Sequence, residues 1–178
     1  MKNLIIYYEG DTDKRFIEKV LIEPLSKKYC RVETICIGSM TGDKLKESIN
    51  KLRMRGNEYI YFADKDDCNC LIKKRDIVLN TIGQNSEDHC VVIVCYELES
   101  WIYAGLGKCG CNKLGLEYFD STELMTKEEF YNIGKNIGIS SKIIFMKKTL
   151  NIFEMKYALK CNESFAYFVK KYIPDFKH

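Results

Sequence analysis

Two stretches that each run from apolar residues straight into acids decide the fold: residues 4–13 read LIIYYEGDTD and residues 59–66 read YIYFADKD. Each begins with an apolar and aromatic run of strand length. Residues 91–99, VVIVCYELE, repeat the pattern. Because ligand sites of open parallel sheets form outside the carboxyl ends of the strands, these acids are the first candidates for a functional site.

Helix-like segments alternate with the strand-like ones. The apolar spacing predicts strands over 4–8, 32–37, 59–63 and 91–95, and helices over 12–21, 43–54 and 71–82. Pro24 should end or bend the first helix. This order is typical of an α/β fold with a mostly parallel four-stranded sheet flanked by helices.

The last third of the chain changes character. Helices are predicted over 98–106, 126–137, 141–151 and 163–173, a loop over 112–120, and residues 152–160 are left undecided. The apolar stripe of the last helix (Phe165, Phe168, Val169, Tyr172 and Ile173) predicts core packing. The expected organisation is a core over residues 1–108, with a helical extension over 109–178 packed on it as one globular unit.

Composition sets limits on the class of protein. The chain has 178 residues, 46% of them hydrophobic and 30% charged, which is typical of a globular protein. Its net charge of +3 is too small to argue for nucleic-acid binding by itself. No apolar run is long enough to span a membrane and no export signal is recognised, so a cytoplasmic location is expected.

The nine cysteines are then expected to be reduced thiols. Four of them lie in strand-like stretches and are interpreted as small buried hydrophobes, namely Cys30, Cys36, Cys90 and Cys95.

The strand-end acids predict a metal site. If the first and third strands are neighbours, their carboxylates converge, and converging carboxylates repel one another unless a cation lies between them. Mg²⁺ or Mn²⁺ is expected, because these hard ions prefer oxygen ligands. One metal or two remain open. The candidate ligands are Glu9, Asp13, Asp64, Asp66, Glu97 and Glu99.

Each acid also has a simpler explanation. Asp13 is consistent with an ordinary first-turn acid that faces the helix dipole, and Asp11 or Thr12 with a helix N-cap. Residues 64–67 are also consistent with a solvated turn. The hypothesis therefore depends on the coincidence of acids at three strand ends, not on any one of them.

At this point the chain resembles a known family. Residues 6–13 followed by Phe16 resemble the first motif of Toprim domains, and are most similar to the branch of the OLD nucleases; Asp64-Lys-Asp66 resembles the Asp-x-Asp motif of the third strand. Gly38 lies where Toprim domains often have a glycine. Residues 96–104 and 162–168 resemble small Toprim-like proteins associated with neighbouring ATPases (the DUF4276-like group).

The resemblance implies magnesium-dependent phosphodiester chemistry. It implies a catalytic and metal-binding role for Glu9, Asp64 and Asp66, and a metal-binding role for Asp13. It also implies a lysine that steadies the transition state, for which Lys147 and Lys148 are the nucleic-acid-binding candidates. No domain with a topoisomerase tyrosine is recognised, so a nuclease is favoured over a topoisomerase.

Two further patterns have both a functional and a structural interpretation. Cys68-Asn-Cys70 and Cys109-Gly-Cys111 carry four thiols for Zn²⁺, although their one-residue gap is shorter than the usual spacing. Trp101 is suited to stacking on a base, but an anchor in the core is the preferred interpretation.

Three functions are weighed. The leading hypothesis is a metal-dependent nuclease with a role in defence against foreign nucleic acid. The second is an effector or regulatory subunit of a separate ATPase, and the third is a non-catalytic Toprim-like protein that binds nucleotide or nucleic acid. The expected partners are nucleic acid, an ATPase and a second copy of the chain.

Overall fold

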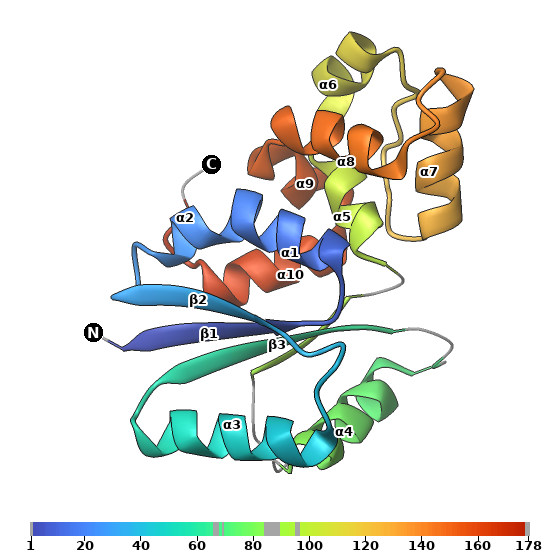
Figure 1. Ribbon diagram of the computed structural model, residues 1–178. Helices are drawn as coiled ribbons and strands as arrows, with labels where there is room; N and C mark the ends of the chain where they lie inside the picture. The colour runs from blue at the N-terminus through green and yellow to red at the C-terminus, as the bar shows by residue number, and fades with distance from the viewer. Residues whose placement is uncertain (1, 66–67, 69, 84–89, 95–96, 177–178) are drawn as a thin grey trace. The chain divides into compact units, whose positions relative to one another are not determined.

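The computed structural model describes residues 2–65, 68, 70–83, 90–94 and 97–176 (Figure 1). The chain divides into two compact units, Met1–Val94 and Cys95–His178, and each is described by itself. The division of the sequence after residue 108, with the second part packed on the first, stays a prediction.

The first unit is built on a four-stranded parallel sheet. Strand β1 (Asn3–Tyr8) lies between β2 (Arg31–Cys36) and β3 (Glu58–Asp64), and β4 (Val91–Val94) follows β3, so the order is β2-β1-β3-β4. All three pairings are parallel, which confirms the predicted fold class. Because parallel strands require crossover connections, a helical segment joins each strand to the next.

Helices cover both faces of this sheet (Figure 1). A helical segment made of α1 (Asp11–Phe16), the π-helical turn η1 (Ile17–Leu21) and α2 (Ile22–Leu25) lies on one face. Helices α3 (Gly42–Met54) and α4 (Leu71–Ile82) lie on the other, where their apolar sides and the sheet form one buried cluster. The sheet contributes Tyr7, Tyr59, Tyr61 and Ala63, among others, to this cluster.

Pro24 acts on the first helical segment as expected. It lies in α2, which ends at the next residue, Leu25. Just before α2, the backbone N–H of Ile22 donates to the carbonyl of Ile17, which gives the wider spacing of a π-turn. Proline has no N–H and its ring crowds the preceding turn of a helix, so a locally widened helix that ends here follows from the sequence.

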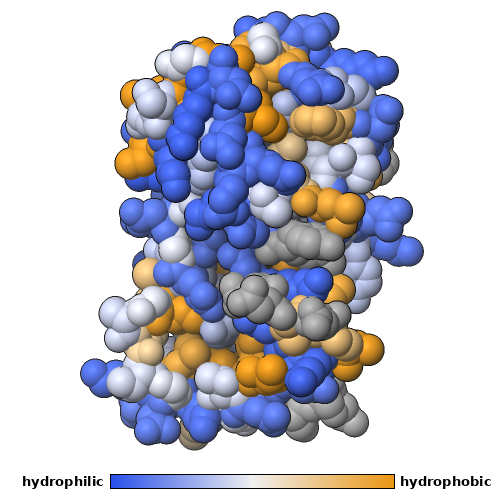
Figure 2. All heavy atoms as spheres, turned by 90° about the vertical axis from the view of Figure 1, so that its right-hand side faces the viewer, coloured by the Kyte–Doolittle hydropathy of each residue, from blue (hydrophilic) through white to orange (hydrophobic). Residues whose placement is uncertain are grey.

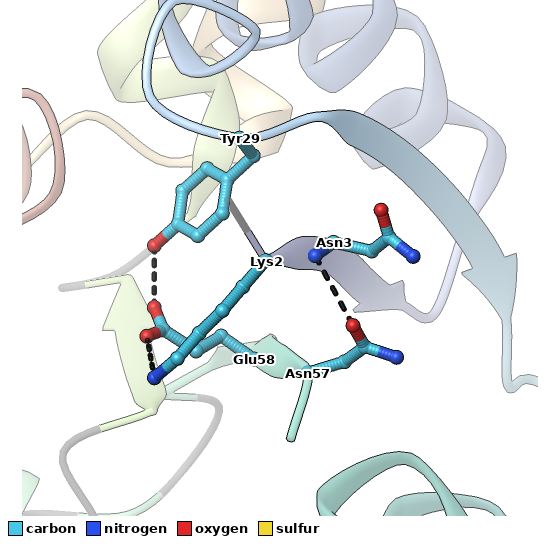
Figure 3. Close-up of polar contacts among 5 residues, drawn as sticks. All are labelled: Lys2, Asn3, Tyr29, Asn57 and Glu58. Carbon is cyan, nitrogen blue, oxygen red and sulfur yellow. Dashed lines mark hydrogen bonds and ion pairs between the residues drawn. The ribbon is translucent and has the colours of Figure 1, made fainter. Parts of the chain in front are cut away.

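Polar contacts at the amino edge of the sheet hold β1 in register with β3 (Figure 3). The backbone N–H of Asn3 donates to Oδ1 of Asn57 over 3.1 Å, and the Lys2 ammonium lies 2.9 Å from the Glu58 carboxylate. The Tyr29 phenol donates to the same carboxylate over 2.7 Å. These two hydrogen bonds, Lys2 first, lower the pKa of Glu58. The same register determines which residues of β1 and β3 lie side by side at the carboxyl edge of the sheet.

The second unit is helical in its described part. It contains α5 (Leu98–Ala104), α6 (Gly107–Leu114), α7 (Lys127–Asn136), α8 (Lys142–Asn151), α9 (Met155–Cys161) and α10 (Glu163–Tyr172). Trp101 is fully buried, and its ring centroid lies 5.2 Å from that of Phe165 and 5.5 Å from that of Phe168. The predicted apolar stripe of the last helix is buried, so its assignment to the core is confirmed.

Two sequence-based boundaries in this unit were wrong. Residues 98–106 were expected as one helix and residues 112–120 as a loop, but α5 ends at Ala104 and α6 occupies Gly107–Leu114. Gly107 has a φ of 55°, which breaks the helical path between the two helices. Glycines at 107 and 110 lower the helix propensity of α6 and conceal it in the sequence.

Among the helices of the described residues, none combines the length and the apolar character that crossing a bilayer requires. Figure 2 shows that the face it draws carries hydrophilic side chains with apolar ones in scattered groups. The exposed large apolar side chains include Met54, Ile72, Leu124 and Tyr167.

Candidate metal centre at the carboxyl edge of the sheet

The two strands that carry the main candidate acids are direct neighbours. Strand β1 pairs with β3, and the last registered pair is Tyr7 with Tyr61. Glu9 follows Tyr7 by two residues and Asp64 follows Tyr61 by three, so both acids lie at the carboxyl edge of the sheet. The condition on which the sequence argument rested, that the first and third strands are neighbours, is therefore met.

Asp13 is bound to the backbone of the turn that follows β1. Its Oδ2 accepts the backbone N–H of Glu9 over 3.1 Å and that of Gly10, the N-cap of α1, over 2.9 Å. Asp13 therefore acts as a first-turn acid, as its simpler explanation predicted, because its carboxylate accepts hydrogen bonds from N–H groups at the start of the helix. An ionised carboxylate has about four acceptor sites, so this role is compatible with metal binding, which stays a prediction.

Gly38 lies against the backbone of Glu9 from the end of β2. A Cβ on Gly38 would lie 2.8 Å from the carbonyl oxygen of Glu9, closer than side chains are found to approach. The Cys36 thiol donates to the same carbonyl over 3.6 Å, and the N–H of Ile37 donates to the carbonyl of Tyr8 over 2.8 Å. Glycine at this position thus lets the segment after β2 pack tightly against the residue that follows β1.

The carboxylate of Glu9 interacts electrostatically with Tyr61, a buried residue of β3. Burial first, and then the charge and hydrogen bond of Glu9, raise the pKa of Tyr61 to about 12. The phenol is therefore a neutral donor near neutral pH. Tyr61 is not among the residues predicted for the site, and only its place opposite Tyr7, once β1 and β3 are paired, could have pointed to it.

Asp64 is the last residue of β3 and is half-buried. The next residue, Lys65, donates its backbone N–H to the carbonyl of Val94 over 3.1 Å, so the backbone around Asp64 is held by β4. Side chains alternate along a strand, and Tyr61 and Ala63 point into the α3–α4 cluster. Asp64 therefore projects from the opposite face, the one that α1 covers (Figure 1).

Three further acids were predicted as ligands, namely Asp66, Glu97 and Glu99. Asp66 lies outside the described residues. Glu97 is the N-cap residue of α5, and Glu99, in the first turn of that helix, is buried with 2% exposure. Both belong to the second unit, so their participation in a site with Glu9 stays a prediction.

The donor chemistry suits a hard cation, but the described part of the chain does not complete a metal site. The carboxylates of Glu9, Asp13 and Asp64 offer the oxygen ligands that Mg²⁺ and Mn²⁺ prefer. Within the residues that the structure describes, no group of three or more His, Cys, Asp and Glu side chains is arranged to hold a metal ion. Asp66, the predicted partner of Asp64, falls in a gap of that description.

Of the residues considered for contact with nucleic acid, the two lysines are exposed and the tryptophan is buried. Lys147 and Lys148 are both exposed on α8, and their role stays a prediction. Trp101 is fully buried and its indole N–H donates to Oγ of Ser164 over 2.7 Å. A buried ring has no face to offer to a base, so the preferred interpretation of Trp101 as a packing anchor is confirmed.

The exposure of the cysteines contradicts the interpretation of two of them as buried hydrophobes and weakens the zinc hypothesis. Cys30 and Cys36 are exposed, so treating them as buried hydrophobes was wrong. Cys30 precedes β2 and Cys36 ends it, and β2 lies at the edge of the sheet that the described residues form. Cys90 is half-buried and Cys95 lies outside the described residues. In the second pair of the zinc hypothesis, Cys109 is exposed and Cys111 is buried. Residues two apart on a helix face different sides, so this pair does not present two thiols to one ion.

The contrast between Cys109 and Cys111 predicts selective thiol chemistry. Burial first raises the pKa of Cys111 to about 11, because the thiolate is poorly solvated there, so Cys111 stays protonated at neutral pH. Brief treatment of the folded protein with iodoacetamide at pH 8 should alkylate Cys109 and spare Cys111, as read by peptide mass spectrometry. Urea-unfolded protein is the control, in which both should react. Equal labelling of the two in the folded protein would contradict the burial of Cys111.

Comparisons with known proteins support the fold. No family model matches the chain, and no curated protein matches it. Among solved structures, the C-terminal region of the Burkholderia pseudomallei OLD protein is similar, with a TM-score of 0.50, 17% sequence identity and 97% of each chain covered. At this identity the likeness concerns the fold alone. The predicted fold class, a parallel four-stranded sheet flanked by helices, is confirmed, and the likeness does not bear on the DUF4276-like group.

Proposed function

We infer that this chain is a divalent-metal-dependent nuclease whose catalytic edge carries Glu9, Asp64 and Asp66. One observation carries the proposal: Glu9 directly follows β1 and Asp64 ends β3, and these parallel strands are hydrogen-bonded neighbours. Carboxylates that end neighbouring strands of an open parallel sheet lie where such folds bind ligands. The likeness to the OLD region supports the same fold framework but does not by itself carry the activity.

The residues of the edge have separable tasks under this proposal. Glu9, Asp64 and Asp66 bind Mg²⁺ or Mn²⁺, with Asp13, Glu97 and Glu99 as further candidate ligands. Asp13 fixes the backbone of Glu9 through the two N–H groups it accepts. A divalent cation held by these carboxylates would supply polarisation of the phosphodiester and activation of water. Lys147 and Lys148 contact phosphate groups of the substrate.

The test of this proposal is cleavage that depends on the metal. The purified full chain is incubated with single-stranded DNA, double-stranded DNA and RNA, each with Mg²⁺, with Mn²⁺ or with EDTA. We expect cleavage of at least one substrate with a divalent cation and none with EDTA, because the carboxylates have no catalytic function without the cation. Cleavage that is unchanged by EDTA would contradict the proposal. Retained binding without turnover under every metal would instead identify a non-catalytic Toprim-like protein.

A second candidate function has a specific observation behind it. The similar solved structure is one region of a larger protein, and this chain matches 97% of that region. In that protein the region is therefore joined to further segments. We propose that a separate ATPase takes the place of those further segments here, and that this chain is its effector subunit. The resemblance of residues 96–104 to proteins with ATPase neighbours supports this proposal. Cleavage that appears only when a co-purifying ATPase is added back would distinguish this function from an autonomous nuclease.

A further inference from the structure

The basic charge of the chain is concentrated in α8, α9 and α10. Residues 142–172 hold seven lysines, two acids and no arginine or histidine, a net charge of +5 against +3 for the whole chain. Six of the seven lysines are exposed, and one of the two acids, Glu154, is paired with Lys156 over 2.5 Å. Positive charge of this kind attracts the phosphates of nucleic acid, but does not distinguish one form of nucleic acid from another.

Tyr167 of α10 adds an exposed aromatic ring to this basic segment. The residue is 67% exposed, and it is the only aromatic one among the exposed large apolar side chains of the described residues. The core side of the helix is formed by Phe165, Phe168 and Tyr172, which are all buried. The ring of Tyr167 points away from them, so it takes no part in the core that α10 builds.

Two lysines follow Tyr167 on the same side of α10. Lys170 and Lys171 come three and four residues later, which makes them neighbours of Tyr167 on the helix surface. The ammonium of Lys171 lies 6.0 Å from the ring centroid of Tyr167 and 4.9 Å from that of Tyr172. Because Tyr172 is buried, the second contact holds the ammonium against a fixed ring, next to the exposed one. An open ring beside positive charge is the combination with which proteins bind single strands.

We propose that this face of α10 binds single-stranded nucleic acid, with a base stacked on Tyr167 and phosphates contacted by Lys170 and Lys171. This inference rests on the proposed function, to which it adds a class of substrate and a binding site. The bases of a duplex are already stacked and paired, whereas those of a single strand are open to an aromatic ring. Every base has a flat face, so the site should prefer single strands without reading their sequence.

The test is binding in EDTA, where no divalent cation is free to support cleavage. Fluorescence anisotropy measures the affinity of the full chain for labelled oligothymidine and for a duplex of the same length. We expect Tyr167→Ala to weaken binding of the single strand roughly 10-fold, within the range for loss of one stacked base, and to change duplex binding by less than about 2-fold. Tyr167→Phe keeps the ring and should stay within about 2-fold of wild type.

Leu124→Ala is the matched control, because Leu124 is 68% exposed, lies in the same unit and has no ring. It should bind the single strand as wild type does, and thermal unfolding checks that every variant is folded. The lysines are tested through salt. Replacing Lys170 and Lys171 together with glutamine should lower the slope of log affinity against log salt by about 1.4, since each phosphate contact on a single strand contributes about 0.7.

A change in the ligand gives a second readout that does not depend on any variant. An abasic strand of the same length keeps the phosphates but has no base to stack. Wild type should bind it roughly 10-fold more weakly than oligothymidine, and Tyr167→Ala should lose most of this difference. Equal affinity of wild type for the two strands would show that no base is stacked, and would overturn the inference.

The outcomes separate this inference from the proposed function. Equal affinity of Tyr167→Ala and wild type for the single strand overturns the role of Tyr167 and leaves the nuclease proposal standing. Equal weakening for single strand and duplex also overturns it, as does a wild-type chain that binds no single strand. A wild-type chain that binds single strands through Tyr167, but cleaves no substrate with any divalent cation, keeps the binding site and overturns the nuclease.

Discussion

Replacing Glu9 with glutamine should reduce metal-dependent cleavage by about 10³-fold, because a metal ligand at the reacting phosphate is worth several kcal/mol of transition-state stabilisation and each 1.4 kcal/mol is tenfold in rate. The glutamine keeps the size of the side chain, so the change removes charge and not shape. The backbone contacts of Glu9 with Asp13 and Gly38 do not involve its side chain and should persist.

The measurement is the initial rate of cleavage at saturating Mg²⁺ or Mn²⁺, with thermal unfolding to show that the variant is folded. Glu33→Gln is the matched control, because Glu33 lies on β2 of the same sheet and is paired with Arg31 over 2.6 Å, away from the carboxyl edge. We expect the control to cleave at the wild-type rate. If Glu9→Gln cleaves at the wild-type rate, Glu9 has no role in catalysis, even though the protein is then a nuclease.

The fold was predictable because the pattern of the first unit is local. Buried strands that run into acids, separated by helices of fixed apolar spacing, leave few arrangements other than a parallel sheet. The sequence also placed Glu9 and Asp64 at strand ends. It could not place the two strands beside each other, since the order β2-β1-β3-β4 is a property of the whole sheet. The nuclease hypothesis was therefore conditional on a pairing that only the structure supplies.

The finer features of the site depend on contacts that no local pattern encodes. Tyr61 looks like any other aromatic residue of a buried strand until the register brings it beside β1. Asp13 was left between a capping role and a metal-binding role, and its two backbone hydrogen bonds establish the first without deciding the second. Cys36 was misjudged for the same reason, because a strand-like environment does not reveal that its strand is an edge.

The two segments that resembled the DUF4276-like group acquire a structural explanation. The indole N–H of Trp101 donates to Oγ of Ser164, and that hydroxyl donates to Oδ1 of Asn162 over 2.8 Å. Oδ1 of Asn162 also accepts the N–H of Phe165 over 2.9 Å, which caps α10. The tryptophan of one segment and the Asn-x-Ser-Phe sequence of the other thus form one polar chain inside the second unit, so both have a folding role independent of any ligand.

Replacing Trp101 with alanine should therefore lower the free energy of unfolding by about 4 kcal/mol, in the range for deleting a large buried aromatic side chain. The change empties a site between Phe165 and Phe168 and removes the donor to Ser164. Because Trp101 is the single tryptophan, unfolding in urea is best followed by far-ultraviolet circular dichroism.

The matched control for that experiment is Tyr167→Ala, an aromatic residue of α10 that is 67% exposed. Its loss should change the unfolding free energy by no more than about 0.5 kcal/mol, as for most surface substitutions. Trp101→Phe should fall between the two, since it keeps most of the ring volume but leaves the Ser164 hydroxyl without its donor. If Trp101→Ala were as stable as wild type but bound single-stranded nucleic acid less well, the tryptophan would be a stacking platform after all, and the packing of the second unit described above would be wrong.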